Sequence, residues 1–236
     1  MKNIDYISKL NKDQFEAVTY LGGPLLIVAG AGSGKTRVLT SKIAHIIDQK
    51  KAFPNQILAV TFTNKAAKEM QYRVSELLKK KAVGLSWLGT FHSISAKILR
   101  KHAKAVGLNY NFTILDQDDQ TRLIKNICKS ENIDTKKISP NYIHSVIDKW
   151  KNNGWYPQDV NLSKSDVLEK YFLKVYKIYQ SKLLDLNACD FSDLLLHTVK
   201  IFKNFEDICK IYAKNFKFIL VDEYQDTNYI QSQWLK

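Results

Sequence analysis

Cysteine is scarce in this chain of 236 residues, and its three copies are scattered. Cys128, Cys189 and Cys209 lie far apart and form no Cys-x-x-Cys pair, so neither a disulfide framework nor a zinc site is indicated. The five histidines form no His-Glu-x-x-His pattern. The simplest interpretation is that the cysteines are reduced thiols in a cytoplasm.

Long apolar runs and acidic residues are also in short supply. No apolar stretch reaches about 18 residues, and the N-terminus lacks the apolar core of a signal peptide, so we expect a soluble intracellular protein. The net charge is +13. The excess is concentrated in residues 65–104, which hold ten basic residues and two acidic ones. Nucleic acid is the first partner that this charge suggests and an anionic membrane the second, although a run of lysines is equally often a solvated surface.

Residues 25–36 form the most informative stretch of the sequence. The apolar run at 25–28 predicts a buried strand, and the glycines that follow predict a tight turn into a helix. Backbone N–H groups in such a turn bind phosphate oxygens, with Lys35 on the β- and γ-phosphates and the Thr36 hydroxyl on Mg²⁺. The strict pattern asks for Gly at position 29, where this chain has Ala29. The stretch predicts a nucleoside triphosphate site; the alternative is a glycine-rich turn that ends in Lys-Thr by chance.

Strand and helix patterns alternate along the first half of the chain. Apolar runs at 57–62 and 86–88 predict further strands, each followed by a helix, and a last strand is expected at 216–221. This alternation is typical of a parallel sheet, in which ligands bind at the carboxyl ends of the strands. Three segments are expected at those ends, namely residues 30–36, 61–64 and 90–93.

Between residues 116 and 187 the sequence favours helix alone. Asp116 is expected to cap one helix and Pro140 to open another, and a tyrosine-rich stripe marks a third. The stripe could serve nucleic acid, but core packing is the favoured interpretation. The sequence therefore predicts an α/β domain formed by residues 1–112 and 188–236, with an all-helical subdomain at 113–187 inserted into it.

The predicted strand at 216–221 runs directly into Asp222 and Glu223. A phosphate loop needs such a partner, because Asp222 can hold Mg²⁺ while Glu223 polarises the attacking water. The alternative is that Asp222 caps the next helix and Glu223 is merely exposed to solvent. Together with Lys35 and Thr36, the pair favours a nucleotide-hydrolysing enzyme.

Four segments, in order, resemble motifs I, Ia, Ib and II of the UvrD/Rep/PcrA helicases of superfamily 1A. They are Ala-Gly-Ala-Gly-Ser-Gly-Lys-Thr-Arg at 29–37, Thr-Phe-Thr-Asn-Lys-Ala-Ala at 61–67, Gly-Thr-Phe-His-Ser at 89–93 and Val-Asp-Glu-Tyr-Gln-Asp-Thr-Asn at 221–228. Residues 10–18 resemble the family's Q motif, and residues 190–195 resemble a further family segment. Ala29 is common in this family's loop, whereas Tyr224 stands where Phe is more usual.

This resemblance implies a fold and an activity. The implied fold is an incomplete RecA-like P-loop NTPase sheet (subdomain 1A) with an inserted helical subdomain (1B). The implied activity is that of an ATP-dependent DNA helicase that moves 3′ to 5′ along single-stranded DNA, in DNA repair or replication restart. The implied cofactors are ATP and Mg²⁺.

The resemblance also implies roles for individual residues. Gln14 would read the adenine edge, in competition with a capping box that it is expected to form with Asn11. Gln225 would sense the γ-phosphate or the attacking water. The implied nucleotide and metal set is Gln14, Ala29, Gly30, Ala31, Gly32, Ser33, Gly34, Lys35, Thr36, Arg37 and Asp222, with Glu223, Lys35 and Gln225 catalytic. The implied DNA contacts are Thr61, Phe62, Thr63, Asn64, Thr90 and His92, and Lys149, Lys151 and Asn152 would meet the duplex ahead of the single strand.

Members of that family are much longer than this chain and carry a second motor domain, whose arginines close over the γ-phosphate. Because an arginine finger contributes ~10³–10⁵ in rate, the chain alone is expected to bind ATP and single-stranded DNA weakly and to unwind nothing. A sheet that lacks its neighbouring strand is expected to leave an edge that promotes self-association.

The expected partners are single-stranded DNA, single–double-strand junctions, the second motor domain, and repair or replication proteins, with no membrane. The expected location is the bacterial cytoplasm, at the nucleoid. Three other functions stay open on the sequence: the motor part of a helicase–nuclease, a nucleic-acid-binding module with nucleotide as a structural ligand, and a P-loop kinase. The Glu-Tyr-Gln that follows Asp222 and the basic DNA track argue against the kinase.

Overall fold

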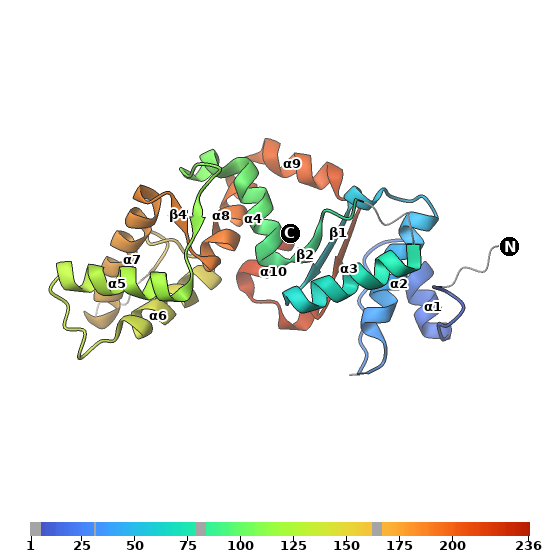
Figure 1. Cartoon of the computed structure of the whole chain (residues 1–236), viewed down its shortest axis with the longest axis horizontal. Helices are drawn as coiled ribbons and strands as arrows, with labels where there is room; N and C mark the ends of the chain where they lie inside the picture. The colour runs from blue at the N-terminus through green and yellow to red at the C-terminus, as the bar shows by residue number, and fades with distance from the viewer. Residues whose placement is uncertain (1–5, 31, 79–83, 162–166) are drawn as a thin grey trace. The chain divides into compact units, whose positions relative to one another are not determined.

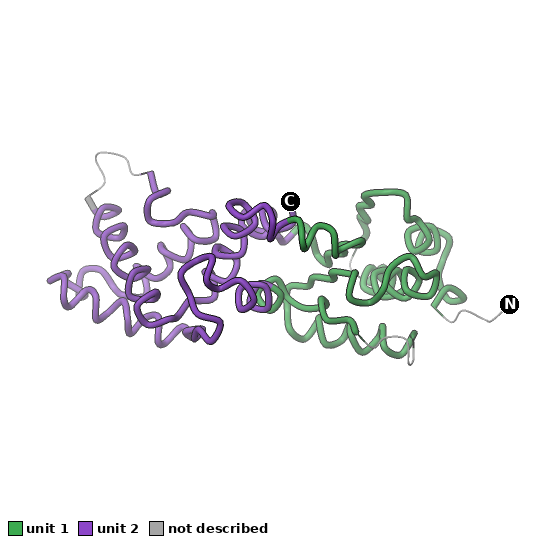
Figure 2. Tube along the Cα trace, turned by 90° about the horizontal axis from the view of Figure 1, so that it is seen from above, with its two compact units in different colours: residues 1–94, 210–225 green, residues 95–209, 226–236 purple. Residues whose placement is uncertain are grey.

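The computed structural model describes residues 6–30, 32–78, 84–161 and 167–236. The chain divides into two compact units (Figure 2). We call the first the sheet unit; it comprises Met1–Ile94 and Lys210–Gln225. The second, the helical unit, comprises Ser95–Cys209 and Asp226–Lys236. The chain therefore enters the helical unit for the second time directly after Gln225.

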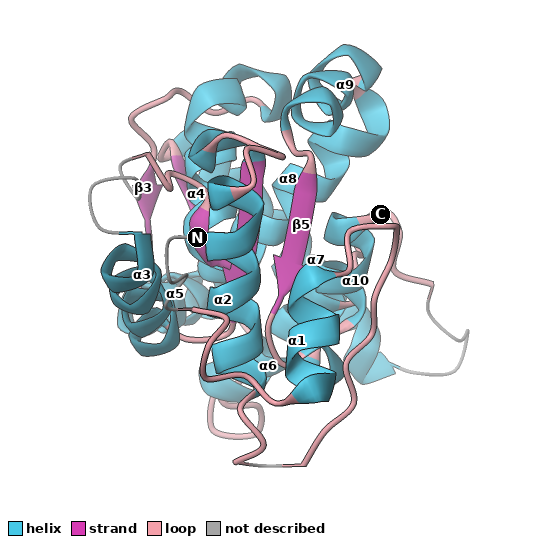
Figure 3. Ribbon diagram, turned by 90° about the vertical axis from the view of Figure 1, so that its right-hand side faces the viewer, coloured by secondary structure: helices cyan, strands magenta, loops and turns pink. Residues whose placement is uncertain are grey.

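Three parallel strands build the sheet of the sheet unit, in the order β2-β1-β5 (Figure 3). They are β1 (Ile57–Thr61), β2 (Leu88–Thr90) and β5 (Phe218–Val221). Ala59 pairs with Leu88 on one side and with Leu220 on the other, so β1 is the central strand and all its residues are buried. Because the strands are parallel, the segments that follow them emerge at the same end of the sheet.

Of the described helices, α1 (Lys12–Thr19), α2 (Lys35–Asp48) and α3 (Asn64–Leu78) lie wholly in the sheet unit. Helix α3 packs against β1 and β2, α2 packs against α3, and α1 packs against α2 (Figure 1). The buried residues of α3 are Ala67, Met70, Val74 and Leu78, whose spacing of three and four residues places them on one helix face. The predicted capping box of Asn11 and Gln14 begins α1 and is confirmed.

The apolar run at 25–28 is not a strand in this structure, so the prediction of a buried strand there is wrong. Its side chains are exposed, from 36% for Ile27 to 88% for Val28. A strand needs partners for its backbone N–H and C=O groups, and β1 already has β2 and β5 as neighbours. Among the described residues no strand pairs with 25–28, and β5 is an edge strand whose Ile219 is 50% exposed.

The helical unit contains the three helices that the sequence predicts at 116–187, namely α5 (Gln117–Ser130), α6 (Pro140–Asn152) and α7 (Val167–Asp185). It also contains α8 (Phe191–Asn204) and the short α10 (Tyr229–Leu235). Helices α4 (Phe91–His102) and α9 (Glu206–Asn215) have residues in both units. Asp116 caps α5 as predicted, and Pro140 is the first residue of α6, after the cap Ser139.

The structure also contains short elements that the sequence pattern did not predict, and two of them, strands β3 (Thr113–Ile114) and β4 (Ala188–Cys189), lie at the borders of the helical segment. These two strands pair in parallel. Short 3₁₀ helices are η1 (Pro54–Gln56), η3 (Ala103–Val106) and η4 (Tyr224–Asp226). In the tyrosine stripe of α7, Tyr176 and Tyr179 are fully buried and belong to the core, as the favoured interpretation holds, whereas Tyr171 is 47% exposed.

Candidate nucleotide and DNA site

The glycine-rich loop leads into the N-terminus of α2, as a phosphate cradle requires. Gly32 and Gly34 have φ angles of 76° and 90°, a left-handed conformation that favours glycine. Among the described residues no side chain caps the N-terminus of α2. The N–H groups of a helix's first turn are donors that phosphate oxygens can accept from. Lys35 Nζ donates to the carbonyls of Ala29 at 2.9 Å and Gly30 at 3.2 Å, and is thus held back over the loop. Ala31 lies outside the described residues.

Gln14 ties helix α1 to this loop. Its Oε1 accepts from the Asn11 backbone N–H at 3.1 Å, and its Nε2 donates to the Ser33 carbonyl at 3.0 Å. A Cβ atom at Gly34 would stand 2.9 Å from this Nε2, a second reason for glycine at that position. Both ends of the Gln14 amide are engaged, so an adenine edge would have to compete with the capping box and with Ser33 for it.

The Asp-Glu pair follows β5 directly and forms a strained turn. Glu223 has φ of 49°, unusual for a residue with a side chain, and its Oε2 accepts from Gln225 Nε2 at 2.6 Å. Burial raises the pKa of Asp222 above its ordinary value, and the neighbouring Glu223 charge raises it further. A backbone hydrogen bond from Glu223 and the positive charge of Lys35 act in the opposite direction. The Lys35 charge thus acts on the pKa of Asp222, which supports the prediction that the loop and the Asp-Glu pair belong to one site.

The donor set at this site suits Mg²⁺. Thr36, which is half-buried at the start of α2, supplies a hydroxyl oxygen and Asp222 supplies a carboxylate. Mg²⁺ prefers such hard oxygen ligands, takes only one or two protein carboxylates, and completes its shell with water and phosphate oxygens. In keeping with this, the described residues contain no group of three His, Cys, Asp or Glu side chains that could hold a metal alone. A bound cation would lower the pKa of Asp222 again, because a cation favours the ionised carboxylate.

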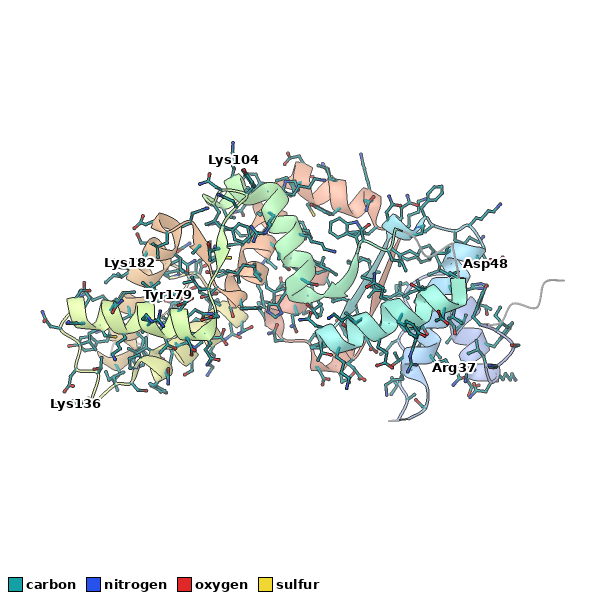
Figure 4. The ribbon with its side chains drawn as sticks, viewed as in Figure 1. Arg37, Asp48, Lys104, Lys136, Tyr179 and Lys182 are labelled. Atoms are coloured by element: carbon teal, nitrogen blue, oxygen red, sulfur yellow. The ribbon has the colours of Figure 1, made fainter. Side chains whose placement is uncertain are left out.

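Arg37 completes the predicted nucleotide set. It is exposed in the first turn of α2 (Figure 4). Its Cβ lies 3.9 Å from the position that a Cβ on Gly34 would take, so its side chain starts beside the loop.

Two of the predicted DNA segments lie side by side, because Thr61 of β1 pairs with Thr90 of β2. Thr61 is fully buried and donates its hydroxyl to the Thr63 carbonyl at 3.1 Å, so it supports the turn rather than forming its surface. Thr63 and Asn64 are exposed there, and Thr63 Oγ1 accepts from the Ala66 N–H at the start of α3.

Phe62 is half-buried on the same turn. Its ring meets the buried Phe91 ring edge to face, with centroids 5.8 Å apart and planes at 71°. Phe62 is therefore a fixed aromatic ring at the carboxyl end of the sheet, of the kind that can stack on a nucleic-acid base.

Thr90 and His92 lie at the start of α4. The Thr90 N–H donates to Ser93 Oγ at 2.9 Å, and the Ser93 N–H donates to Thr90 Oγ1 at 3.2 Å, a reciprocal cap that keeps Thr90 buried. A Cβ atom at Gly89 would stand 2.5 Å from Ser93 Oγ, so glycine is required before this cap. His92 is half-buried in the first turn of the helix.

Two of the three predicted duplex contacts are not available for that role. Lys151 is fully buried and pairs with Asp190 at 2.6 Å and Asp193 at 2.8 Å. Asn152 is half-buried, and both polar atoms of its side chain are hydrogen-bonded, Nδ2 to Asp148 and Oδ1 to Asn228. Only Lys149 is exposed. Sequence reasoning missed this buried network because its partners lie about 40 residues apart; the one local signal was the Asp-x-x-Asp cap at Asp190.

Comparison with known proteins decides the family. The family model described as "UvrD/REP helicase N-terminal domain" matches residues 10–236. The chain belongs to the UvrD/REP helicase family. The predicted resemblance is thereby confirmed, and the range matched to the UvrD/REP model contains Gln14, the phosphate loop and the Asp-Glu turn.

Curated relatives carry helicase names. The "Probable DNA helicase II homolog" of Rickettsia conorii is 48% identical over 239 residues, which cover 100% of this chain and 36% of the relative. The "DNA helicase II" of Rickettsia typhi is 46% identical over 240 residues, with coverage of 100% and 36%. The "ATP-dependent DNA helicase PcrA" of Staphylococcus epidermidis is 45% identical over 230 residues, with coverage of 98% and 31%. This UvrD/REP chain thus spans about a third of the length of these relatives. Within its described part, no helix is long and apolar enough to cross a membrane.

Proposed function

We propose that this chain is the ATP- and single-stranded-DNA-binding N-terminal part of a DNA helicase that moves 3′ to 5′. The observation that carries the proposal is the glycine-rich loop that enters the N-terminus of α2 with two left-handed glycines and with Lys35 Nζ bonded to the loop carbonyls. A loop with a cationic side chain opposite a metal-binding carboxylate has the composition of a site for the β- and γ-phosphates of a nucleotide. Membership of the UvrD/REP family supports ATP as the nucleotide and DNA as the substrate.

In this proposal the side chains change partners when ATP binds. Lys35 Nζ leaves the carbonyls of Ala29 and Gly30 for phosphate oxygens, which carry more negative charge. Thr36 and Asp222 would hold Mg²⁺, which would supply positive charge for the phosphate oxygens. Glu223 orients and deprotonates the attacking water, and the Gln225 amide, which now donates to Glu223, turns toward the γ-phosphate or that water.

The turn after β1 is the proposed track for single-stranded DNA. Phe62 offers a ring on which any base can stack, and the exposed Thr63 and Asn64 offer polar contacts to the backbone. Lys65 and Lys68 are exposed on the first turns of α3 and attract phosphates, so binding weakens as salt rises. In the helical unit, Lys149 is the predicted duplex contact that stays on the surface.

The longer relatives support the further proposal that a second motor domain follows in the complete protein, and that translocation needs both. The complete protein would act at single–double-strand junctions with repair or replication proteins, in the bacterial cytoplasm at the nucleoid.

Binding of a fluorescent ATP analogue with Mg²⁺ tests the nucleotide site on this chain. We expect saturable binding that Lys35→Ala abolishes, because the lysine is the main cation for the phosphates. Lys12→Ala, which removes an exposed lysine from α1, is the matched control and keeps binding. Equal affinity for the wild type and Lys35→Ala refutes the proposal.

Hydrolysis is tested in the complete protein. Glu223→Gln is expected to bind ATP and DNA but to lose DNA-stimulated hydrolysis and unwinding, because the amide cannot accept the water's proton. If Glu223→Gln keeps full biological activity, nucleotide is a structural ligand and the chain belongs to a nucleic-acid-binding module.

A further inference from the structure

The last turn of helix α6 carries polar side chains on a face that points into the helical unit. Asp148, Lys151 and Asn152 are three and four residues apart, so they share this face. Lys151 is fully buried, and its ammonium lies 2.6 Å from Asp190 and 2.8 Å from Asp193, the two residues of the capping box that begins α8. Removing such groups from water is costly, so their presence indicates a site where the position of one helix against another is specified.

Asn152 extends this network to helix α10. Its Nδ2 donates within α6 to the Asp148 carbonyl at 2.9 Å and to Asp148 Oδ2 at 3.0 Å. Its Oδ1 accepts from Asn228 Nδ2 at 2.9 Å. Asp148 in turn accepts from the Ser192 hydroxyl of α8. The end of α6 is therefore hydrogen-bonded to both α8 and α10.

Asn228 has one donor more than its own helix needs. It is the N-cap of α10: its Oδ1 accepts from the Gln231 N–H at 3.0 Å, and its N–H donates to Gln231 Oε1 at 3.0 Å. This capping box is complete without the Nδ2 group. Asp and Ser cap helices about as well as Asn, so the cap alone does not call for an amide. The Nδ2 group is accounted for by its bond to Asn152.

The position of Asn228 in the chain makes this bond relevant to the nucleotide site. Only Asp226 and Thr227 separate it from Gln225, and the boundary between the two units falls immediately after Gln225. Three residues span at most about 10 Å when extended. Gln225, the end of the Asp-Glu turn, therefore stays within this distance of Asn228, which is hydrogen-bonded inside the helical unit.

We propose that the Asn152–Asn228 hydrogen bond is a positioning contact that couples the Asp222–Gln225 turn to the helical unit. It rests on the proposed function, because ATP must bind at that turn for the coupling to matter. When ATP binding moves the turn, Asn228 moves with it, and its hydrogen bond to Asn152 transmits the displacement to α6. The ion pairs of Lys151 fix α6 against α8. By reciprocity, DNA that orders the helical unit raises the affinity of the turn for ATP.

Hydrogen exchange on this chain tests the coupling. In the wild type, saturating ATP with Mg²⁺ should slow amide exchange both in residues 221–226 and in residues 149–153 at the end of α6. Asn228→Ser keeps a capping oxygen, adds no charge and removes the amide. It should retain the slowing at 221–226 and reduce that at 149–153 by about two- to tenfold, the range for loss of one neutral hydrogen bond. Asn228→Asp should behave in the same way, and Asn153→Ser is the matched control that keeps the wild-type pattern.

The outcomes separate this inference from the proposed function. Protection at 221–226 without protection at 149–153 in the wild type overturns the coupling, as does unchanged protection at 149–153 in both Asn228 variants. If ATP slows exchange nowhere around Lys35, the proposed function is wrong and this inference falls with it. A stability cycle with Asn152→Ala and Asn228→Ser gives an independent measure: the two losses should be non-additive, and strict additivity means that the two side chains do not interact.

Discussion

The buried Lys151 is the cation that neutralises two buried carboxylates of the helical unit. Burial lowers the pKa of Lys151, but the adjacent carboxylates of Asp190 and Asp193 outweigh this effect and raise it, so the ammonium stays charged. Tyr179 donates to Asp190 at 3.0 Å and Gln180 donates to Asp193 at 3.1 Å, which satisfies further lone pairs. The charge is therefore paired and hydrogen-bonded, the condition under which a buried ion is tolerated.

Lys151→Met should destabilise the chain by about 3–5 kcal/mol, because it leaves two buried carboxylates without a cation. Urea unfolding followed by circular dichroism measures the loss. Lys149→Met, two residues away on the surface of the same helix, should change stability by less than about 0.5 kcal/mol. Adding Asp190→Asn and Asp193→Asn to Lys151→Met should restore part of the loss, because Asn retains the capping oxygen. A Lys151→Met protein as stable as Lys149→Met contradicts this account.

His197 makes the stability of the helical unit depend on pH. Burial is the main reason that its pKa is lowered from 6.5 to about 4. The negative charge of Asp193 raises this pKa, and the positive charges of Lys151 and Lys200 lower it further. Its Nδ1 lies 2.6 Å from Tyr156 Oη, and no described residue forms a hydrogen bond with its Nε2. The folded chain thus binds fewer protons than the unfolded chain between these two values. The stabilisation is complete above pH 6.5 and is lost as the pH falls toward 4.

The loss over this window should amount to about 3 kcal/mol for the fully buried ring. Thermal unfolding at pH 7, 5.5 and 4.5 measures it. His197→Gln should flatten the fall in melting temperature across the window, whereas His144→Gln, a change on α6 that leaves Asp193 untouched, should not. If His197→Gln has the same pH slope as the wild type, other groups dominate acid unfolding.

At the scale of secondary-structure elements, the turn that joins β1 to α3 carries the proposed DNA contact. Phe62→Ala should weaken binding of a short single strand by ~1–3 kcal/mol, because one stacked base loses its ring. Fluorescence anisotropy at fixed salt measures the affinity. Phe53→Ala removes an exposed ring (72%) elsewhere in the sheet unit and should leave the affinity unchanged. Equal losses for the two variants would indicate that Phe62 is not a specific contact.

Element boundaries were predictable where the signal is local. The caps at Asn11 and Asp116 and the start at Pro140 depend on residues within one helical turn, and all three are present. The lack of a strand at 25–28 was not predictable from its apolar run, because a strand forms only with a partner and none of the described strands pairs with this segment. Burial of Lys151 also depends on a distant segment, so its sequence neighbourhood resembles an exposed basic turn.

In the candidate site, too, local features were predictable and contacts between distant segments were not. The motifs fall on the loop before α2, the turn after β5 and the turn after β1, and each motif is a contiguous run at the end of an element. The engagement of Gln14 with Ser33 and the bond between Asn152 and Asn228 join segments far apart in the chain, and only the folded structure reveals them.

At the scale of the whole molecule, two exposed apolar features should favour self-association. Edge strand β5 carries Ile219 at 50% exposure, and the unpaired run at 25–28 is exposed throughout. Static light scattering at increasing concentration should show a rising average mass. Ile219→Lys should lower it by placing a charge on the edge, whereas Ile211→Lys on α9, where the side chain is similarly exposed (54%), should not. A constant monomer mass for the wild type would show that the edge is protected.

The register of the sheet has a consequence for how the chain folds. Ile57 of the central strand pairs with Phe218, so β1 meets β5 only after about 160 intervening residues have been synthesised and brought together. The contacts of α5, α6 and α7 are more local, and these helices can associate while β5 is still absent. Helices α5, α6 and α7 should therefore associate first, and closure of the β1–β5 ladder should set the slowest refolding rate of the chain. Residues Asp222 and Glu223, which follow β5 at once, would reach Lys35 only in that last step.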